Sequence, residues 1–239
     1  MSNTFTTVSP WRLGVSEAFG IPAAVLSAGF IGYGALSADA GYSLWLTTLS
    51  TVIIWALPGQ LVLHEMWGLG AAWFAILLAV GLTAVRFLPM AMTLMPVIRD
   101  ERHAPWKLYL AAQFVSMTSW AVCMRRCDDL PREDRLAYLI AFSVTCWSAS
   151  LVTGAIGYYA GGLLPAVVRL GLVFLTPVYF LCMLAGDART RLARISLLCG
   201  AVSGPVLHRI DAQWGLLLAG LLAGTAGYLL QRAIGARRA

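Results

Sequence analysis

The chain has 239 residues, of which 59% are hydrophobic and only 12% carry a charged side chain. Ordinary soluble domains are about one-quarter charged, so 17 basic and 11 acidic side chains cannot cover the surface of a chain whose mean hydropathy is +0.77. This composition excludes a water-soluble globular fold, and it makes the net charge of +6 a sign of membrane orientation rather than of nucleic-acid binding.

We therefore expect an all-α, polytopic membrane bundle of about eight transmembrane helices, with seven as the alternative count. About 20 apolar residues cross a bilayer. The third apolar block is too long for one straight helix and contains Arg86, Pro89 and Pro96. The seventh block is short, so either of these two is expected to be broken, tilted or re-entrant. In chain order the blocks are residues 18–38, 42–64, 69–98, 106–124, 136–160, 163–186, 192–208 and 212–234.

The basic residues favour a cytoplasmic location for both termini, because cytoplasmic loops retain Lys and Arg. With eight crossings, eleven of the 17 Lys and Arg residues fall on the inner side. The outer side then holds Arg99, Arg102, Lys107 and Arg209. The three basic residues between 99 and 107 fit that side poorly, which is the reason for keeping a seven-span model.

The longest polar stretch, residues 125–135, is predicted to be a cytoplasmic linker within one transporter domain that comprises the whole chain. It separates two halves of similar hydropathy, about 14–124 and 136–234. Residues 29–35 (GFIGYGA) resemble residues 154–160 (GAIGYYA), and repeated halves are typical of transporters. Chance similarity between membrane helices rich in Gly and Ala is the alternative.

A Pro-Gly pair with a polar amide beside it interrupts the second block. The sequence Pro58-Gly59-Gln60 follows shortly after Trp55. Inside a membrane helix Pro removes a backbone donor, and the free N–H groups of a broken helix can bind an anionic group. We expect a broken helix that contributes to a substrate site. A simple kink, with Gln60 bonded to a neighbouring helix, is the alternative.

Two further features of the apolar blocks are candidates for the same site. Thr176-Pro177 is the expected counterpart of the first break in the second half. Arg86 is the costliest residue, because a guanidinium near the bilayer centre carries a penalty of about 2.5–3.5 kcal/mol. It is expected to anchor a substrate carboxylate or to form an internal ion pair. A helix end misplaced by the block boundaries is the alternative.

The acidic residues lie in loops and at the ends of the apolar blocks, so the sequence shows no buried carboxylate relay. A proton-driven cycle would need His64, His208 or a carboxylate at a block end, such as Glu17. Facilitated diffusion is the alternative.

The sequence lacks the motifs of the enzyme classes that we considered. His64 has no second His at the helical repeat of a zinc protease, and no glycine-rich phosphate loop is present. Cys123 and Cys127 have no further ligands at metal-site spacing. We expect no enzyme activity, no cofactor and no metal. A membrane-embedded enzyme or an assembly factor without a transport cycle is the competing class.

The chain resembles the AzlC family, the larger subunit of branched-chain amino acid exporters, over about residues 14–234. The resemblance implies secondary export of branched-chain or other neutral amino acids through the bacterial inner membrane. It also implies a small membrane subunit of the AzlD type as a partner. The strongest stretches are Gly20-Ile21-Pro22, residues 28–43, residues 147–157 and residues 215–227.

The chain departs from the family pattern at several polar positions, so it is identified as a divergent member. The residues before Gln60 are Leu57-Pro58-Gly59, Ala84 stands where an Asn is expected, and Phe87 replaces a His. Residues 118–120 (TSW) fall where an acidic pair is common. These losses remove polar groups that could hydrate a zwitterion or relay a proton.

The expected substrate site lies in the middle of the membrane, between the two halves. Its backbone groups come from the two Pro-containing segments, its cation is Arg86, and two tryptophans contact an aliphatic side chain. The predicted site residues are Trp55, Pro58, Gly59, Gln60, Arg86, Trp147, Thr176 and Pro177.

Overall fold

The computed structural model describes residues 9–187, 191–210, 222, 224–227 and 229, and within these residues the chain is helical without strands. It divides into two compact units, Met1–Val178 and Tyr179–Ala239. The predicted last span, 212–234, lies largely outside the described residues. The predicted site residues all lie in unit 1.

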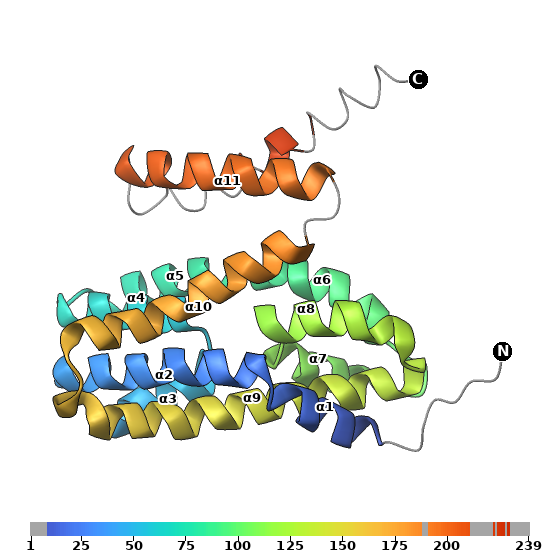
Figure 1. Ribbon diagram of the computed structural model, residues 1–239, viewed down its shortest axis with the longest axis horizontal. Helices are drawn as coiled ribbons and strands as arrows, with labels where there is room; N and C mark the ends of the chain where they lie inside the picture. Colours follow the sequence, from blue (N-terminus) through green and yellow to red (C-terminus); the bar gives the residue numbers. More distant parts are fainter. Residues whose placement is uncertain (1–8, 188–190, 211–221, 223, 228, 230–239) are drawn as a thin grey trace. The chain divides into compact units, whose positions relative to one another are not determined.

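The helices follow the apolar blocks, but several blocks are divided in two (Figure 1). Short 3-10 turns, Cys127–Asp129 and Gly161–Leu163, flank the longest helix. The α-helices are α1 (Pro10–Ala18), α2 (Ile21–Asp39), α3 (Leu44–Ile53), α4 (Leu57–Gly68), α5 (Trp73–Ala84), α6 (Phe87–Ile98), α7 (Pro105–Gln113), α8 (Met117–Arg126), α9 (Arg132–Ala160), α10 (Ala166–Asp187) and α11 (Arg191–Ile210).

Helices α2 and α9 form the centre of unit 1 and pack through glycines. A Cβ at Gly34 would overlap the carbonyl oxygen of Gly154, and a Cβ at Gly157 would overlap that of Ile31. Small residues allow the backbones of membrane helices to approach this closely. The two segments that resemble each other in sequence therefore pack against each other.

Helices α3 and α4 form a hairpin that enters and leaves at the same end of unit 1. Tyr42, just before α3, donates a hydrogen bond from its hydroxyl to the carbonyl oxygen of His64 at 2.7 Å. The rings of these two residues stack with centroids 4.0 Å apart. The block 42–64 is therefore a re-entrant hairpin, not the crossing that the sequence predicted.

Helices α7 and α8 form a second hairpin, which begins and ends at the other end of unit 1. Arg135, at the start of α9, donates from Nη1 to the carbonyl oxygen of Val97 at 2.9 Å. Arg102, before α7, forms an ion pair with Glu133. The prediction that Arg99 to Lys107 lie on the opposite side from residues 125–135 was therefore wrong, because the chain between them returns to the side that it entered.

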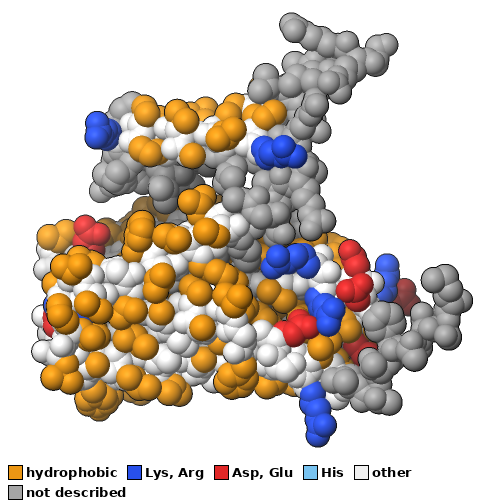
Figure 2. Space-filling view, in the orientation of Figure 1, with side chains coloured by type: hydrophobic (Ala, Val, Ile, Leu, Met, Phe, Trp, Pro, Cys, Tyr) orange, Lys and Arg blue, Asp and Glu red, His pale blue; other side chains and the backbone are white. Residues whose placement is uncertain are grey.

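We call the end of unit 1 that holds residues 99–107 and 125–135 the basic end. Figure 2 shows that most of the charged side chains on the visible face of unit 1 gather there, whereas the rest of that face is mainly hydrophobic. At the opposite end, Arg169 is paired with Asp39. This separation agrees with an integral membrane protein whose apolar body lies between two polar ends.

The described residues contain two helices that are individually long and apolar enough to cross a membrane, α2 and α9 with the turn that follows it. Helices α5 and α6 meet at an angle of 46° and together form a third candidate span. The break that the sequence predicted in the third block is confirmed, and it falls at Val85–Arg86. The count of eight crossings is not reached in the described part of the chain.

Candidate functional site

The connection between α3 and α4 is a complete helix break rather than a kink. Pro58 lies in the first turn of α4, where its missing N–H costs nothing. Trp55 has a φ of +35°, which is unfavourable for a bulky side chain. It is buried, and its Nε1 donates to Ser150 Oγ on α9 at 3.2 Å. Packing and this hydrogen bond hold the strained residue in place.

A buried polar cluster surrounds this break. Gln60 is fully buried and donates from Nε2 to Ser50 Oγ at 3.1 Å and to Thr51 Oγ1 at 2.9 Å. The hydroxyl of Tyr33 lies 2.6 Å from Ser50 Oγ and 2.7 Å from Nε2 of His64. These bonds tie α2, α3 and α4 together in an apolar interior, where an unpaired polar group is costly.

One acceptor of this cluster has no partner. The side-chain oxygen Oε1 of Gln60 is buried and forms no hydrogen bond in the structure. Leaving such a group unsatisfied costs about 1–3 kcal/mol. An uncompensated polar atom at a helix break is therefore a candidate contact for a ligand.

The broken helix places two opposite partial charges close together. The carbonyl groups at the C-terminal end of α3 carry negative partial charge, and the N–H groups at the start of α4 carry positive partial charge. Ala56, the residue before α4, provides no side-chain cap. At the other hairpin, Ser116 and Ser119 form a capping box at the start of α8. The first hairpin is thus the better site for an anionic group.

The second half contributes Thr176 to the same region. Its Oγ1 lies so close to Gly29 that a Cβ there would overlap it, and a methyl group of Leu57 contacts Gly29 as well. Thr176 is 5% exposed and its hydroxyl has no hydrogen-bond partner. Helix α10 continues through Pro177 without a break, so the two Pro segments differ in backbone although they lie near each other.

Aromatic side chains line the neighbouring apolar part of the site. Trp55 and Leu57 belong to one buried cluster, against which Phe114 and Trp147 pack. The rings of Phe114 and Trp147 are perpendicular, with centroids 6.1 Å apart. Trp147 thus packs against the same buried cluster that contains Trp55.

Arg86 lies at the α5–α6 break and is exposed. Its Cζ lies 5.0 Å from the centre of the Phe87 ring. The structure shows no hydrogen bond or ion pair between Arg86 and the polar cluster among the described residues. Three residues before Arg86, Thr83 on α5 has its Oγ1 close to Gly59 on α4.

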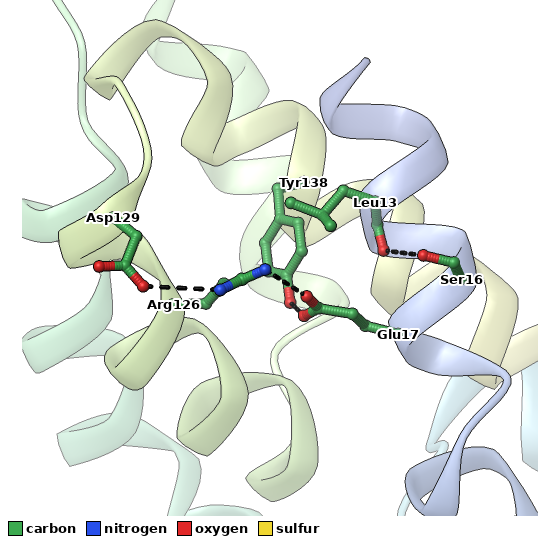
Figure 3. A network of polar contacts seen from close by, with 6 residues as sticks. All are labelled: Leu13, Ser16, Glu17, Arg126, Asp129 and Tyr138. Atoms are coloured by element: carbon green, nitrogen blue, oxygen red, sulfur yellow. Dashed lines mark hydrogen bonds and ion pairs between the residues drawn. The ribbon is translucent and has the colours of Figure 1, made fainter. Parts of the chain in front are cut away.

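Of Glu17 and His64, the two proton-coupling candidates whose side chains the structure describes, His64 belongs to the cluster. Glu17 lies at the basic end, where it pairs with Arg126 (Oε1 to Nη2, 2.9 Å) and accepts a hydrogen bond from the hydroxyl of Tyr138 (Figure 3). Arg126 also pairs with Asp129. The side chain of His208 is not among those that the structure describes.

Four hydroxyl-bearing residues of the site were not predicted from the sequence: Tyr33, Ser50, Thr51 and Ser150. On α3 the signal is a set of hydroxyl-bearing residues in an otherwise apolar helix, in which Thr47 lies one helical turn before Ser50 and Thr51. Because these side chains are buried, the site is closed to solvent in this structure. Two cavities of about 350 and 340 Å³ lie at the basic end, away from the α3–α4 break.

A family model described as AzlC protein matches residues 22–164, which is more than half of the chain. The matched region runs from α2 to the turn after α9 and includes both hairpins. Comparisons with curated proteins and with solved structures give no significant match.

Proposed function

Because the chain belongs to the AzlC family, we propose that it exports branched-chain or other neutral amino acids by a secondary mechanism. The family is associated with branched-chain amino acid export and is of the transporter type. The observation that best supports an amino acid as substrate is the α3–α4 break, whose two helix ends have opposite partial charges. A neutral amino acid is a zwitterion and has the complementary pair of charges.

In our proposal the substrate carboxylate binds the first N–H groups of α4, those of Leu57 and Gly59, since Pro58 has none. The substrate ammonium binds the carbonyl groups that end α3 and the unpaired oxygens of Gln60 and Thr176. A charged side chain on the substrate would find no partner in this cluster, which favours neutral amino acids.

The aliphatic side chain of the substrate contacts Trp55 and Trp147. Both pack in the apolar cluster beside the break, and an apolar pocket favours branched side chains over polar ones. One added or missing methylene on the substrate changes its binding free energy by about 1–3 kcal/mol. This part of the site would therefore bind some neutral amino acids more tightly than others without excluding close analogues.

In our proposal Arg86 attracts the carboxylate of a substrate that approaches the closed site. Arg86 lies at the 46° bend between α5 and α6, and Thr83 on α5 has its Oγ1 close to Gly59 on α4. A change of that bend would bring the guanidinium toward α4. Alternating access by movement of helices around a central site is the general scheme for secondary transporters.

We further propose that the basic end faces the cytoplasm of the cell membrane, together with both termini. Lys and Arg are retained on the cytoplasmic side. With the second hairpin returning to its own side, the basic residues of 99–107 join those of 125–135, and the conflict in the sequence-based orientation disappears. A small subunit of the AzlD type is the proposed partner.

The test is transport by the full chain in proteoliposomes, with and without the AzlD-type subunit. We expect labelled leucine and valine to cross faster than in protein-free vesicles, with competition by isoleucine and none by lysine or glutamate. If no neutral amino acid moves in either preparation, the exporter proposal is wrong, and an assembly role without a transport cycle takes its place.

A further inference from the structure

Two short helices at the basic end begin with the same kind of sequence. Helix α1 starts with Pro-Trp-Arg-Leu at residue 10, and α7 starts with Pro-Trp-Lys-Leu at residue 105. Proline fits the first turn of each helix. Trp11 is 50% exposed and Trp106 is 60% exposed. Exposed tryptophans next to basic residues are typical of the membrane–water interface.

These two helix starts line the same groove. A cavity of about 340 Å³ is bordered by Trp11, Trp106, His103 and Lys107, and its apolar wall includes Leu110 of α7 and Ile140 of α9. No carboxylate lines it. The groove therefore combines a basic rim with an apolar wall.

The rim contains one basic side chain, Lys107, and one buried polar atom, Nδ1 of His103. Nδ1 of His103 is buried and has no hydrogen-bond partner in the structure. The ammonium of Lys107 lies 5.9 Å from the centre of the Trp106 ring. Glu133, at the same end, is paired with Arg102 and does not line the groove.

The second cavity at this end has a different character. It is bordered by Glu17, Arg126 and Asp129, which pair with one another. Its charges are satisfied within the protein. Among the described residues, no ion pair satisfies the positive charge of Lys107 in the groove between α1 and α7.

We propose that this groove binds the headgroup of an anionic phospholipid, with an acyl chain along the wall formed by α7 and α9. The phosphate binds the ammonium of Lys107, and the tryptophans flank the glycerol region. A soluble anion would gain nothing from Leu110 and Ile140, whereas an acyl chain gains about 0.8 kcal/mol for each CH₂ that it buries. The occupant is therefore a lipid.

The test is native mass spectrometry of the purified full chain, titrated with phosphatidylglycerol or with phosphatidylcholine of the same acyl chains. We expect tighter binding of the first phosphatidylglycerol. Lys107→Gln should weaken this binding about fivefold, because a basic residue near a membrane surface contributes about 1 kcal/mol toward an anionic lipid. Binding of phosphatidylcholine should change less.

Arg99→Gln is the matched control, because Arg99 is exposed at the same end but does not line the groove. It should leave the lipid preference unchanged. Equal binding of the two lipids by the natural chain, or equal losses in the two variants, would overturn the proposal. Displacement of the bound lipid by deacylated glycerophosphoglycerol at equal concentration would show a soluble-anion site and would also overturn it.

Discussion

Gln113, the last residue of α7, donates a hydrogen bond from Nε2 to the carbonyl oxygen of Ile53, the last residue of α3, at 3.1 Å. The tips of two hairpins that enter from opposite ends of unit 1 thus meet at an exposed contact between these two residues. Half-helices that meet in this way place polar backbone at membrane depth only where protein surrounds it. The contact places the α3–α4 break, with its cluster, at the junction of the two hairpins.

Gln60→Met should abolish most transport while leaving the protein folded. Methionine has a similar volume but removes the unpaired oxygen and both donated hydrogen bonds, which are worth about 1 kcal/mol each. Removal of the unsatisfied acceptor offsets part of that loss. We expect the initial rate of leucine transport to fall at least about tenfold, which corresponds to about 1.4 kcal/mol.

The matched control is Thr145→Val, because Thr145 bonds only to the carbonyl of Ala141 on its own helix. It should transport at nearly the natural rate. Equal rates for the natural chain and Gln60→Met, at equal amounts of reconstituted protein, would remove Gln60 from the site.

Gly34→Ala should destabilise unit 1. Its added Cβ would overlap the carbonyl oxygen of Gly154 on α9, and overpacking of this kind costs about 1–3 kcal/mol. Gly81→Ala is the control, since no atom lies within 4 Å of the Cβ position there and alanine favours helix over glycine. Thermal unfolding in detergent should show a lower midpoint for the first variant and an equal or higher one for the second. Equal midpoints would contradict the close α2–α9 packing.

The helical class and the break near Pro58 could be predicted because they depend on local composition and on the missing N–H of proline. The two hairpins could not be predicted from the sequence. Two half-length helices have the same hydropathy as one crossing, and only contacts such as that between Tyr42 and His64 distinguish them. The cluster depends on the same fold. Gln60 was visible from its neighbours in sequence, whereas Tyr33 and Ser150 join the site from other helices.

Single cysteines at Glu101 and Asp128 should lie on the same side of the membrane. The structure joins the two loops through the Arg102–Glu133 ion pair, whereas eight crossings would separate them. The measurement is labelling of intact cells with a membrane-impermeant maleimide, in a chain whose five cysteines are replaced. Both positions should react only after the cells are opened. Reaction of one position alone in intact cells would disprove the second hairpin.

Arg86→Gln should raise the KM for leucine more than it lowers the maximal rate. In our proposal Arg86 attracts the carboxylate before the site closes, while the binding groups at the break remain intact. Arg209 lies outside unit 1 and is also exposed, so Arg209→Gln is the control for loss of one positive charge. Concentration-dependent uptake into proteoliposomes separates the two parameters. An unchanged KM for Arg86→Gln would exclude this role.

His64→Gln should remove the pH dependence of transport if protons drive the cycle. Histidine is the side chain whose charge ordinarily changes between about pH 5 and 8. Nε2 of His64 lies within hydrogen-bond distance of the hydroxyls of Tyr33 and Ser37, so protonation of the ring adds an N–H and a charge to this cluster. Glutamine stays neutral throughout this range, so the transport rate of the His64→Gln variant should not change with pH. His103→Gln, at the basic end, should keep the profile of the natural chain. A profile for His64→Gln that follows the natural one would assign coupling to another group.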